Sequence, residues 1–219
     1  MLLDLVQKLH NSTKRDYLAR MLDDKVHCMT EARKFEFAYW DGDRRFGYGG
    51  YTYQPGRWKP VAEALIERYG LKPGDRILDL GCGKGYILYE MQRLMPGLIL
   101  VGWDRSAWAV KHPHPEFRGT LLQVPMQDLG IALDNSFELV ISLGALHNLT
   151  IKELASVLPE IERVGRDAYV MVESFRTEQE LFNLQCWCLT AETLIRPEDW
   201  EYLFEHYGYT GDHEFIYFD

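Results

Sequence analysis

The 219-residue sequence contains few cysteines and lacks a long apolar run, and each shortage excludes a class of protein. The four cysteines, Cys28, Cys82, Cys186 and Cys188, form no CxxC pair and no disulfide framework. Cys186-x-Cys188 is more typical of a strand with alternating cysteines than of a redox or metal pair. No stretch approaches the roughly 18 apolar residues of a membrane span, and residues 1–9 lack the cleavage site of a signal peptide. We therefore expect a cytoplasmic protein with no membrane contact.

Basic residues are also scarce. The 24 lysines and arginines are outnumbered by 33 aspartates and glutamates, which gives a net charge of −9. Proteins bind the phosphate backbone of nucleic acids largely through lysine and arginine, so we expect no nucleic-acid partner. With 47% hydrophobic residues the chain can bury one good core, and we expect one domain over residues 1–219. Within it, residues 1–58 should form a helical arm that ends in a glycine- and tyrosine-rich cover, and residues 59–219 should form the core.

One compact signature is present, the stretch RILDLGCGKGYILYEM at residues 76–91. Ile77, Leu78 and Leu80 favour a buried parallel strand, and a glycine-rich turn follows at once. After Tyr86 the apolar residues recur at helical spacing. A ligand can approach the backbone closely at such a strand–turn–helix junction. The tyrosine at position 86 replaces the third glycine of a dinucleotide fingerprint, which argues against a dinucleotide site.

An acidic residue ends the next predicted strand, residues 98–103. Asp104 follows Asp79 by 25 positions. A carboxylate at this place suits a ribose diol, because its oxygens accept hydrogen bonds from two hydroxyl groups. The sequence therefore predicts a nucleoside-binding edge of the sheet.

These motifs resemble those of the class I S-adenosylmethionine-dependent methyltransferases. The Asp-x-Gly-x-Gly-x-Gly pattern at 79–85 matches the first motif of that family, residues 134–149 resemble its fourth-strand motif, and residues 198–211 resemble its last helix and turn. The resemblance covers about residues 60–219. It implies a Rossmann-like, doubly wound α/β fold whose mostly parallel sheet has six to seven strands and an antiparallel edge strand, preceded here by an N-terminal helical and loop extension. It also implies S-adenosylmethionine as cofactor and S-adenosylhomocysteine as product.

The resemblance assigns cofactor contacts to particular positions. Many members have an acidic residue where Pro125 stands, so the adenine contact is assigned to the Met126 backbone and to Gln127. The cofactor-binding residues that it implies are Asp79, Gly81, Cys82, Gly83, Gly85, Asp104, Arg105, Met126, Gln127 and Leu143.

The remaining elements are predicted from hydrophobic periodicity. Members of the family usually have two strands after the last helix, whereas only one fits here, so the strand order at that edge stays open. The sequence predicts strands within 121–129 and at 137–142, 168–174, 188–195 and 213–218, and helices at 58–69, 151–164, 177–185 and around 200–207.

His147 follows the predicted fourth strand, at the edge where open α/β sheets bind ligands. It matches the first histidine of the Leu-His-His-Leu stretch seen in many small-molecule members of the family. His147 is our candidate catalytic residue, because an imidazole can act as a general base near neutral pH. The alternative is that His147 hydrogen-bonds backbone and orders its loop.

Residues 40–58 contain five glycines and four closely spaced aromatic residues, a composition typical of a lid or a binding surface. A packing arm is the alternative. We expect the acceptor of the reaction to contact Tyr48 and Tyr51 in this segment. Arginines suit a carboxylate or phosphate on such a substrate, and the candidates are Arg44, Arg45, Arg57 and Arg176.

Missing motifs narrow the acceptor. The sequence has no Asn-Pro-Pro-Tyr after the fourth strand, no cysteine at that exit for covalent catalysis and no cluster of acids for Mg²⁺. These absences favour metal-independent transfer to a small molecule, at oxygen or nitrogen and less so at carbon, in polysaccharide or secondary-metabolite biosynthesis. A protein or peptide methyltransferase and a non-catalytic cofactor-binding platform are the alternatives. A homodimer is left open.

Overall fold

Six short apolar stretches form one sheet in the computed structural model, which describes residues 1–48 and 51–219. The strands are β1 (Arg76–Leu80), β2 (Ile99–Asp104), β3 (Thr120–Gln123), β4 (Phe137–Leu143), β5 (Gly165–Glu173) and β6 (Asp212–Ile216). They lie in the order β3-β2-β1-β4-β5-β6, and every neighbouring pair is parallel. The order reverses between β1 and β4, which is where doubly wound sheets bind ligands at their carboxyl edge.

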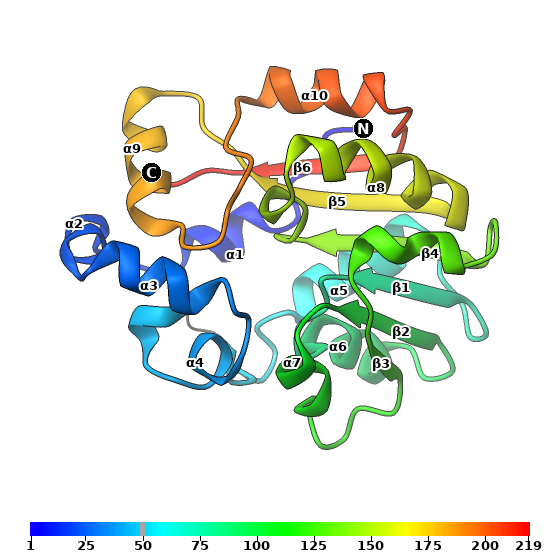
Figure 1. The fold of residues 1–219 in the computed structure, drawn as a ribbon. Coiled ribbons are helices and arrows are strands. Elements are labelled where there is room, and N and C mark those ends of the chain that lie inside the picture. The colour runs from blue at the N-terminus through cyan, green and yellow to red at the C-terminus, as the bar shows by residue number, and fades with distance from the viewer. Residues whose placement is uncertain (49–50) are drawn as a thin grey trace.

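Helices cover both faces of this sheet (Figure 1). Alternate strand residues point to opposite faces: Leu78 and Val140 pack into one buried cluster, and Ile77 and Leu139 into the other. The first cluster includes α8 (Ile151–Val164) and α10 (Pro197–His206), and the second includes α5 (Lys59–Arg68) and α6 (Tyr86–Leu94). The predicted α/β fold with helices on both faces is confirmed.

The edge of the sheet differs from the expectation. β6 runs parallel to β5, with Val172 opposite Phe215, so the antiparallel edge strand was wrong. The reason is the connection: α10 returns the chain across one face, and a strand that starts again from the same end must run parallel. Residues 1–3 then lie along the outer side of β6, where the Leu3 N–H donates to the His213 carbonyl at 2.8 Å.

The strand predicted at 188–195 is also wrong, because other groups use its backbone. The Tyr48 hydroxyl accepts from the N–H groups of Leu189 and Thr190, at 2.6 and 3.1 Å. The carbonyl of His147 accepts from Glu192 and Thr193, both at 3.0 Å. With these backbone groups engaged by side chains and loops, the segment forms no ladder with a neighbouring strand.

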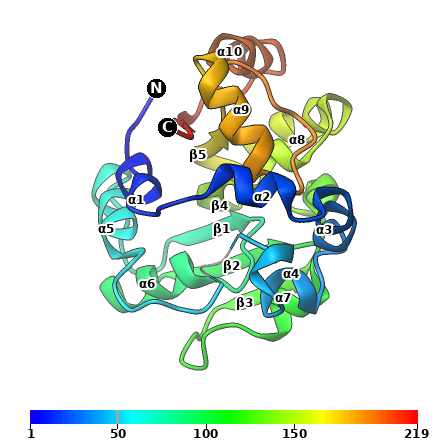
Figure 2. The ribbon, with the colours of Figure 1, turned by 90° about the vertical axis from the view of Figure 1, so that its left-hand side faces the viewer.

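A group of short helices caps the carboxyl edge of the sheet. Figure 2 looks at this edge and shows α2, α3, α4 and α9 in front of the strands. The N-terminal elements are α1 (Gln7–Asn11), α2 (Tyr17–Leu22), α3 (Lys25–Ala32), α4 (Phe37–Trp40) and η1 (Arg44–Phe46), and α9 spans Glu178–Trp187. Smaller elements complete the fold: α7 (Ala107–Lys111), η2 (Met126–Ile131) and η3 (Leu146–Asn148). In the part of the chain that the structure describes, no helix has both the length and the apolar composition that a membrane crossing needs.

Candidate active site

A cavity of about 340 Å³ lies between the carboxyl ends of β1, β2, β4 and β5 and the capping segments. Thirteen of the residues predicted from sequence line it: Asp79, Gly81, Cys82, Gly83, Asp104, Arg105, Met126, Gln127, Leu143, His147, Tyr48, Tyr51 and Arg57. Tertiary structure thus brings together side chains from the glycine turn, three strand ends and the N-terminal arm. Gly49 and Gly50, within the predicted cover, lie outside the described residues.

The glycine turn sits directly against the cavity. Gly81 and Gly83 have φ angles of 77° and 53°, a region that side chains other than glycine rarely adopt. The N–H of Gly81 donates to the Trp103 carbonyl and that of Gly83 to Asp104 Oδ2, both at 2.8 Å. The turn therefore offers a ligand close approach rather than free N–H donors at these two positions. Gly85 faces away, against Leu121 of β3, so its predicted contact with the cofactor is replaced by a packing role.

Asp104 is buried at the end of β2 with its carboxylate held in place. Its oxygens accept from the N–H groups of Gly83 and Ser106, at 2.8 and 2.7 Å. Each oxygen keeps a lone pair for a further donor, such as a ribose hydroxyl. Burial raises the pKa of Asp104, and the two N–H donors oppose that rise.

Asp79 shares this end of the cavity. Burial, and then the charge of Asp104, raises the pKa of Asp79 to about 8. The two carboxyl groups therefore resist ionising together.

The side of the cavity assigned to adenine comes from β4 and η2. Met126 reaches over the turn, so that a Cβ on Gly81 would lie 3.4 Å from its Cε. Gln127 lines the cavity, but its amide donates to Glu153 of α8 at 2.8 Å. The apolar contact of Met126 is thus the better placed of the two for a flat base.

The cover brings a tryptophan that sequence reasoning missed. A Cβ on Gly83 would lie 2.8 Å from Cη2 of Trp40. The indole N–H of Trp40 donates to Ser106 Oγ at 2.8 Å, which fastens the cover to the end of β2. Lys84 of the glycine turn pairs with Asp41, next to Trp40. No motif marked these contacts, because they join segments more than 40 positions apart.

Tyr48 and Tyr51 contribute to an aromatic wall of the cavity. The Tyr51 ring lies 5.1 Å from that of Tyr39 and 4.5 Å from that of Trp40, measured between centroids. Burial raises the pKa of both Tyr48 and Tyr51, so both hydroxyls stay neutral. Closure of the cover over a ligand stays a prediction, which hydrogen exchange with and without S-adenosylhomocysteine would test.

A buried arginine supports this wall. Arg20 donates to the carbonyls of Arg44, Arg45 and Gly47, at 3.0, 3.2 and 2.7 Å. Its guanidinium also lies over the ring of Trp187, 5.1 Å from the centroid. One side chain therefore fixes the turn that precedes Tyr48, a role that a single arginine in sequence does not reveal.

Of the four arginines predicted to hold the substrate, Arg57 lines the cavity. The other three are not among the described residues that line it. Arg44 lies 5.8 Å over the Trp187 ring, and Arg45 pairs with Asp23 at 2.6 Å. These positions correct the prediction for both residues: Arg44 attaches the arm to α9, and Arg45 makes an ion pair within the arm.

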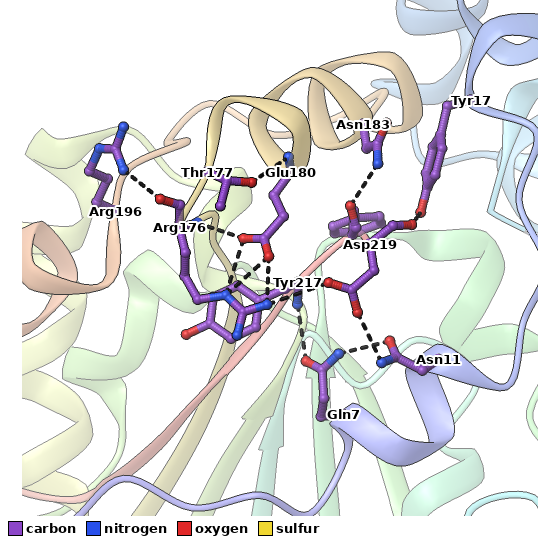
Figure 3. A network of polar contacts seen from close by, with 11 residues as sticks. Gln7, Asn11, Tyr17, Arg176, Thr177, Glu180, Asn183, Arg196, Tyr217 and Asp219 are labelled. Atoms are coloured by element: carbon purple, nitrogen blue, oxygen red, sulfur yellow. Dashed lines mark hydrogen bonds and ion pairs between the residues drawn. The ribbon is translucent and has the colours of Figure 1, made fainter.

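Arg176 is part of a separate polar network around the C-terminus (Figure 3). Its guanidinium donates to Glu180 at 2.5 Å and stacks on the Tyr217 ring, 3.9 Å from the centroid. Asp219 lies 3.4 Å from the same guanidinium. The network joins α9 to the chain end, and the predicted substrate contact of Arg176 is corrected to this structural one.

His147 is buried between β4 and β5, where it contacts Glu173. The Glu173 N–H donates to His147 Nδ1 at 3.3 Å, so the neutral ring carries its proton on Nε2. Nε2 lies 3.5 Å from Glu173 Oε2. Burial lowers the pKa of His147, and the Glu173 charge opposes this only in part. With one ring nitrogen accepting and the other protonated, the geometry favours the loop-ordering alternative over a base.

The residues present fit a nucleoside-bearing cofactor. Gly81 and Gly83 line the cavity with bare backbone, and a Cβ on either would come within 3 Å of Ala145 or Trp40, so the turn admits no side chain. The Asp104 carboxylate supplies acceptors in the same cavity. When bound, S-adenosylmethionine supplies an activated methyl group, and the residues named here would hold its nucleoside.

The sheet order, the glycine turn after β1 and the carboxylate at the end of β2 define a Rossmann-like protein of the nucleoside-cofactor class. A model of the methyltransferase domain matches residues 71–208. The chain belongs to this methyltransferase family, whose cofactor is S-adenosylmethionine.

Individual relatives are more distant. The nocamycin O-methyltransferase of Saccharothrix syringae is 27% identical over 112 residues, which are 49% of this chain and 38% of that protein. A trans-aconitate 2-methyltransferase of Mycobacterium tuberculosis is 34% identical over 67 residues, 31% of this chain and 23% of that protein. The chain therefore spans well under half of the length of both relatives.

Solved structures show the shared fold. A SAM-dependent methyltransferase from Archaeoglobus fulgidus superimposes with a TM-score of 0.54 at 19% identity, over 68% of each chain. The plantazolicin methyltransferase, solved with a pentazolic desmethylPZN analog and SAH, gives 0.55 at 16% identity, over 84% of this chain and 77% of that one.

Proposed function

We propose that this protein transfers the methyl group of S-adenosylmethionine to a small-molecule acceptor. The observation that carries the proposal is a single cavity, about 340 Å³ in volume, shared by Gly83 and Asp104 on one side and by Tyr48 and Tyr51 on the other. A sulfonium methyl group is already activated, so catalysis rests mainly on aligning donor and acceptor in such a space.

In this proposal the two sides of the cavity have different tasks. Asp104 accepts hydrogen bonds from the ribose, Met126 packs on the adenine, and the glycine turn lets the rest of the cofactor pass over backbone. Tyr48 and Tyr51 contact the acceptor, and His147 orders the strand ends between them. The acceptor atom is oxygen or nitrogen. No step needs a metal ion.

The relatives support the small-molecule class, because a nocamycin O-methyltransferase and a trans-aconitate 2-methyltransferase are among them. By analogy with the nocamycin enzyme, we assign the protein to secondary-metabolite biosynthesis. Polysaccharide biosynthesis stays a prediction from the sequence. The cytoplasmic location and a homodimer stay predictions.

The test has two parts. First, calorimetry should detect binding of S-adenosylhomocysteine to the purified protein, and its absence would end the proposal. Second, the protein is incubated with methyl-labelled cofactor and separate metabolite and protein extracts of the source organism. We expect the label in small molecules. Label confined to a protein band would favour a protein methyltransferase, and tight binding without turnover in either extract would favour a cofactor-binding platform.

A further inference from the structure

We propose that Glu173 is the recognition group for a cationic amine acceptor, which makes the protein an N-methyltransferase. The inference rests on the proposed function and extends it to the class of substrate. It starts from a carboxylate at the end of β5 that no sequence motif marked and that lines the cavity between His147 and the aromatic wall.

The Glu173 carboxylate lacks the partners that a buried charge requires. Its side chain is only 13% exposed, and Oε2 is buried without a hydrogen bond. His147 Nε2 lies 3.5 Å from Oε2, which is too long for a good hydrogen bond. A buried carboxylate without a cation or donors is costly, so a site of this kind favours a ligand that supplies both.

The histidine does not neutralise this charge. Burial lowers the pKa of His147, so its ring is neutral at physiological pH. Its Nδ1 accepts from the Glu173 backbone, which turns the Nε2–H edge toward the carboxylate. His147 therefore acts as a positioning residue that sets the direction of Glu173.

The nearby cations are engaged with other groups. Arg15 interacts electrostatically with Glu173. Its guanidinium donates to the carbonyls of His10 and Thr13, at 3.2 and 3.1 Å. The basic residues that line the cavity also have partners: Lys84 pairs with Asp41, Arg57 donates to Thr13, and Arg105 lies over the Phe35 ring. Among the described residues, Glu173 is thus a cavity carboxylate that forms no ion pair with a lysine or arginine, although the charge of Arg15 acts on it from a greater distance.

The walls next to Glu173 suit a cation as well. Tyr39, Trp40, Tyr48 and Tyr51 line the same cavity, with ring centroids 4.5 to 5.9 Å apart. Aromatic faces attract ammonium groups, and most strongly where water is excluded. The Tyr48 hydroxyl already forms hydrogen bonds with the backbone N–H groups of Leu189 and Thr190 and with the Thr190 hydroxyl. A ligand would therefore contact the ring of Tyr48.

The chemistry balances with these groups. The ammonium of the acceptor gives one proton to the Glu173 carboxylate, which frees the nitrogen lone pair. That lone pair forms a bond to the transferred methyl carbon while the carbon–sulfur bond breaks and its electron pair stays on sulfur. The product is a methylated ammonium, and the Glu173 proton returns to solvent after release.

The experiment uses two cofactor analogues, so it needs no acceptor. S-adenosylhomocysteine is neutral at sulfur, whereas sinefungin carries an amine where the cofactor holds its methyl group, the point at which donor and acceptor meet. Calorimetry gives the affinity of both for the wild type, for Glu173→Gln and for Glu178→Gln. Glu178 is an exposed acid at the start of α9, so its variant removes the same charge outside the cavity. Thermal unfolding checks each variant, and Glu173→Asp replaces Glu173→Gln if the latter does not fold.

We expect Glu173→Gln to lower the preference for sinefungin over S-adenosylhomocysteine by about tenfold or more, the range for a charge-assisted hydrogen bond. The affinity of Glu173→Gln for S-adenosylhomocysteine should stay at the wild-type value. The preference of Glu178→Gln for sinefungin over S-adenosylhomocysteine should also stay at the wild-type value. An unchanged preference in Glu173→Gln, or an equal loss in Glu178→Gln, would overturn the amine assignment. Failure of S-adenosylhomocysteine to bind the wild type would instead overturn the proposed function.

Discussion

Trp40 lies over Gly83 so closely that a Cβ on the glycine would be 2.8 Å from Cη2 of the indole. The contact joins the N-terminal arm to the glycine turn that lines the cavity. It also means that the arm and the glycine turn share one wall of the cavity, although 43 positions separate them in sequence.

Gly83→Ala is therefore expected to abolish measurable binding of S-adenosylhomocysteine. The matched control is Gly70→Ala, because Gly70 has a φ of 57° and nothing within 4 Å of its Cβ position. Both variants should lose about 1–2 kcal/mol of stability from the left-handed backbone, and Gly83→Ala should lose more because its Cβ meets Trp40. Only Gly83→Ala should lose binding in calorimetry. Equal binding in the two variants would remove the glycine turn from the site.

Asp104→Ala should weaken binding of S-adenosylhomocysteine at least about tenfold, because hydrogen bonds to a charged group contribute about 1.5–3 kcal/mol each. If Asp104 binds the ribose, a second result is expected. The wild type should bind the 2′-deoxyribose analogue more weakly than the parent compound, and Asp104→Ala should no longer distinguish them. Continued discrimination by the variant would place the ribose elsewhere.

The raised pKa of Asp79 predicts how the stability of the fold depends on pH. Its pKa rises from 3.8 to about 8 in the fold. The unfolded chain therefore loses this proton first, and the free energy of unfolding should fall as pH rises from about 4 to 8. Asp79→Asn has no carboxyl group to titrate. Between about pH 4 and 8, its free energy of unfolding in urea denaturation should therefore rise relative to that of the wild type by at least about 1.4 kcal/mol, the equivalent of one pKa unit. Parallel curves for the two proteins would contradict the raised pKa.

His147→Ala should cost about 1–3 kcal/mol of stability, because it leaves the buried Glu173 N–H without its acceptor. His147→Asn retains a carbonyl oxygen and should recover part of this loss in thermal unfolding. Methyl transfer by His147→Asn should then keep the wild-type dependence on pH. A stable His147→Asn variant whose turnover falls about 10²–10⁴-fold would support the general-base alternative instead.

Tyr48→Phe should loosen the segment after α9. The hydroxyl accepts two backbone N–H groups, from Leu189 and Thr190, and phenylalanine leaves both unsatisfied. Hydrogen exchange should accelerate in peptides that cover residues 188–194 and remain unchanged in the strands. Tyr202→Phe, at an exposed tyrosine of α10, is the control. Unchanged exchange after Tyr48→Phe would mean that other contacts hold the segment.

Local sequence determined the cofactor side of the site. Ile77, Leu78 and Leu80 are apolar in a short run, glycine is required at positive φ just after them, and Ile87 and Met91 recur at helical spacing. Strand, turn and helix therefore follow from contacts within about 15 residues of chain. Asp104 could be placed as well, because a residue that ends a parallel strand must lie at the same edge as its neighbours.

Contacts between distant segments decided the rest of the cavity. Trp40 and Glu173 lie outside the motifs, and Lys84 occupies an unspecified position of the glycine motif. Their roles come from contacts with Gly83, Asp41 and His147, which lie 26 to 43 positions away in the chain. Glu173 did have one signal, its place at the end of a predicted strand. Its lack of a partner depends on where Arg15 and His147 donate and accept, which no pattern records.

Contacts between distant segments also explain the two errors in the predicted fold. The apolar alternation of residues 188–195 is typical of a strand, but Tyr48 and His147 form hydrogen bonds with the backbone N–H groups that a strand would use. The direction of β6 depends on the path of α10 across the sheet, not on the composition of either. Periodicity reports which residues are buried, whereas the partners of a buried backbone or a buried charge are fixed only when distant segments meet.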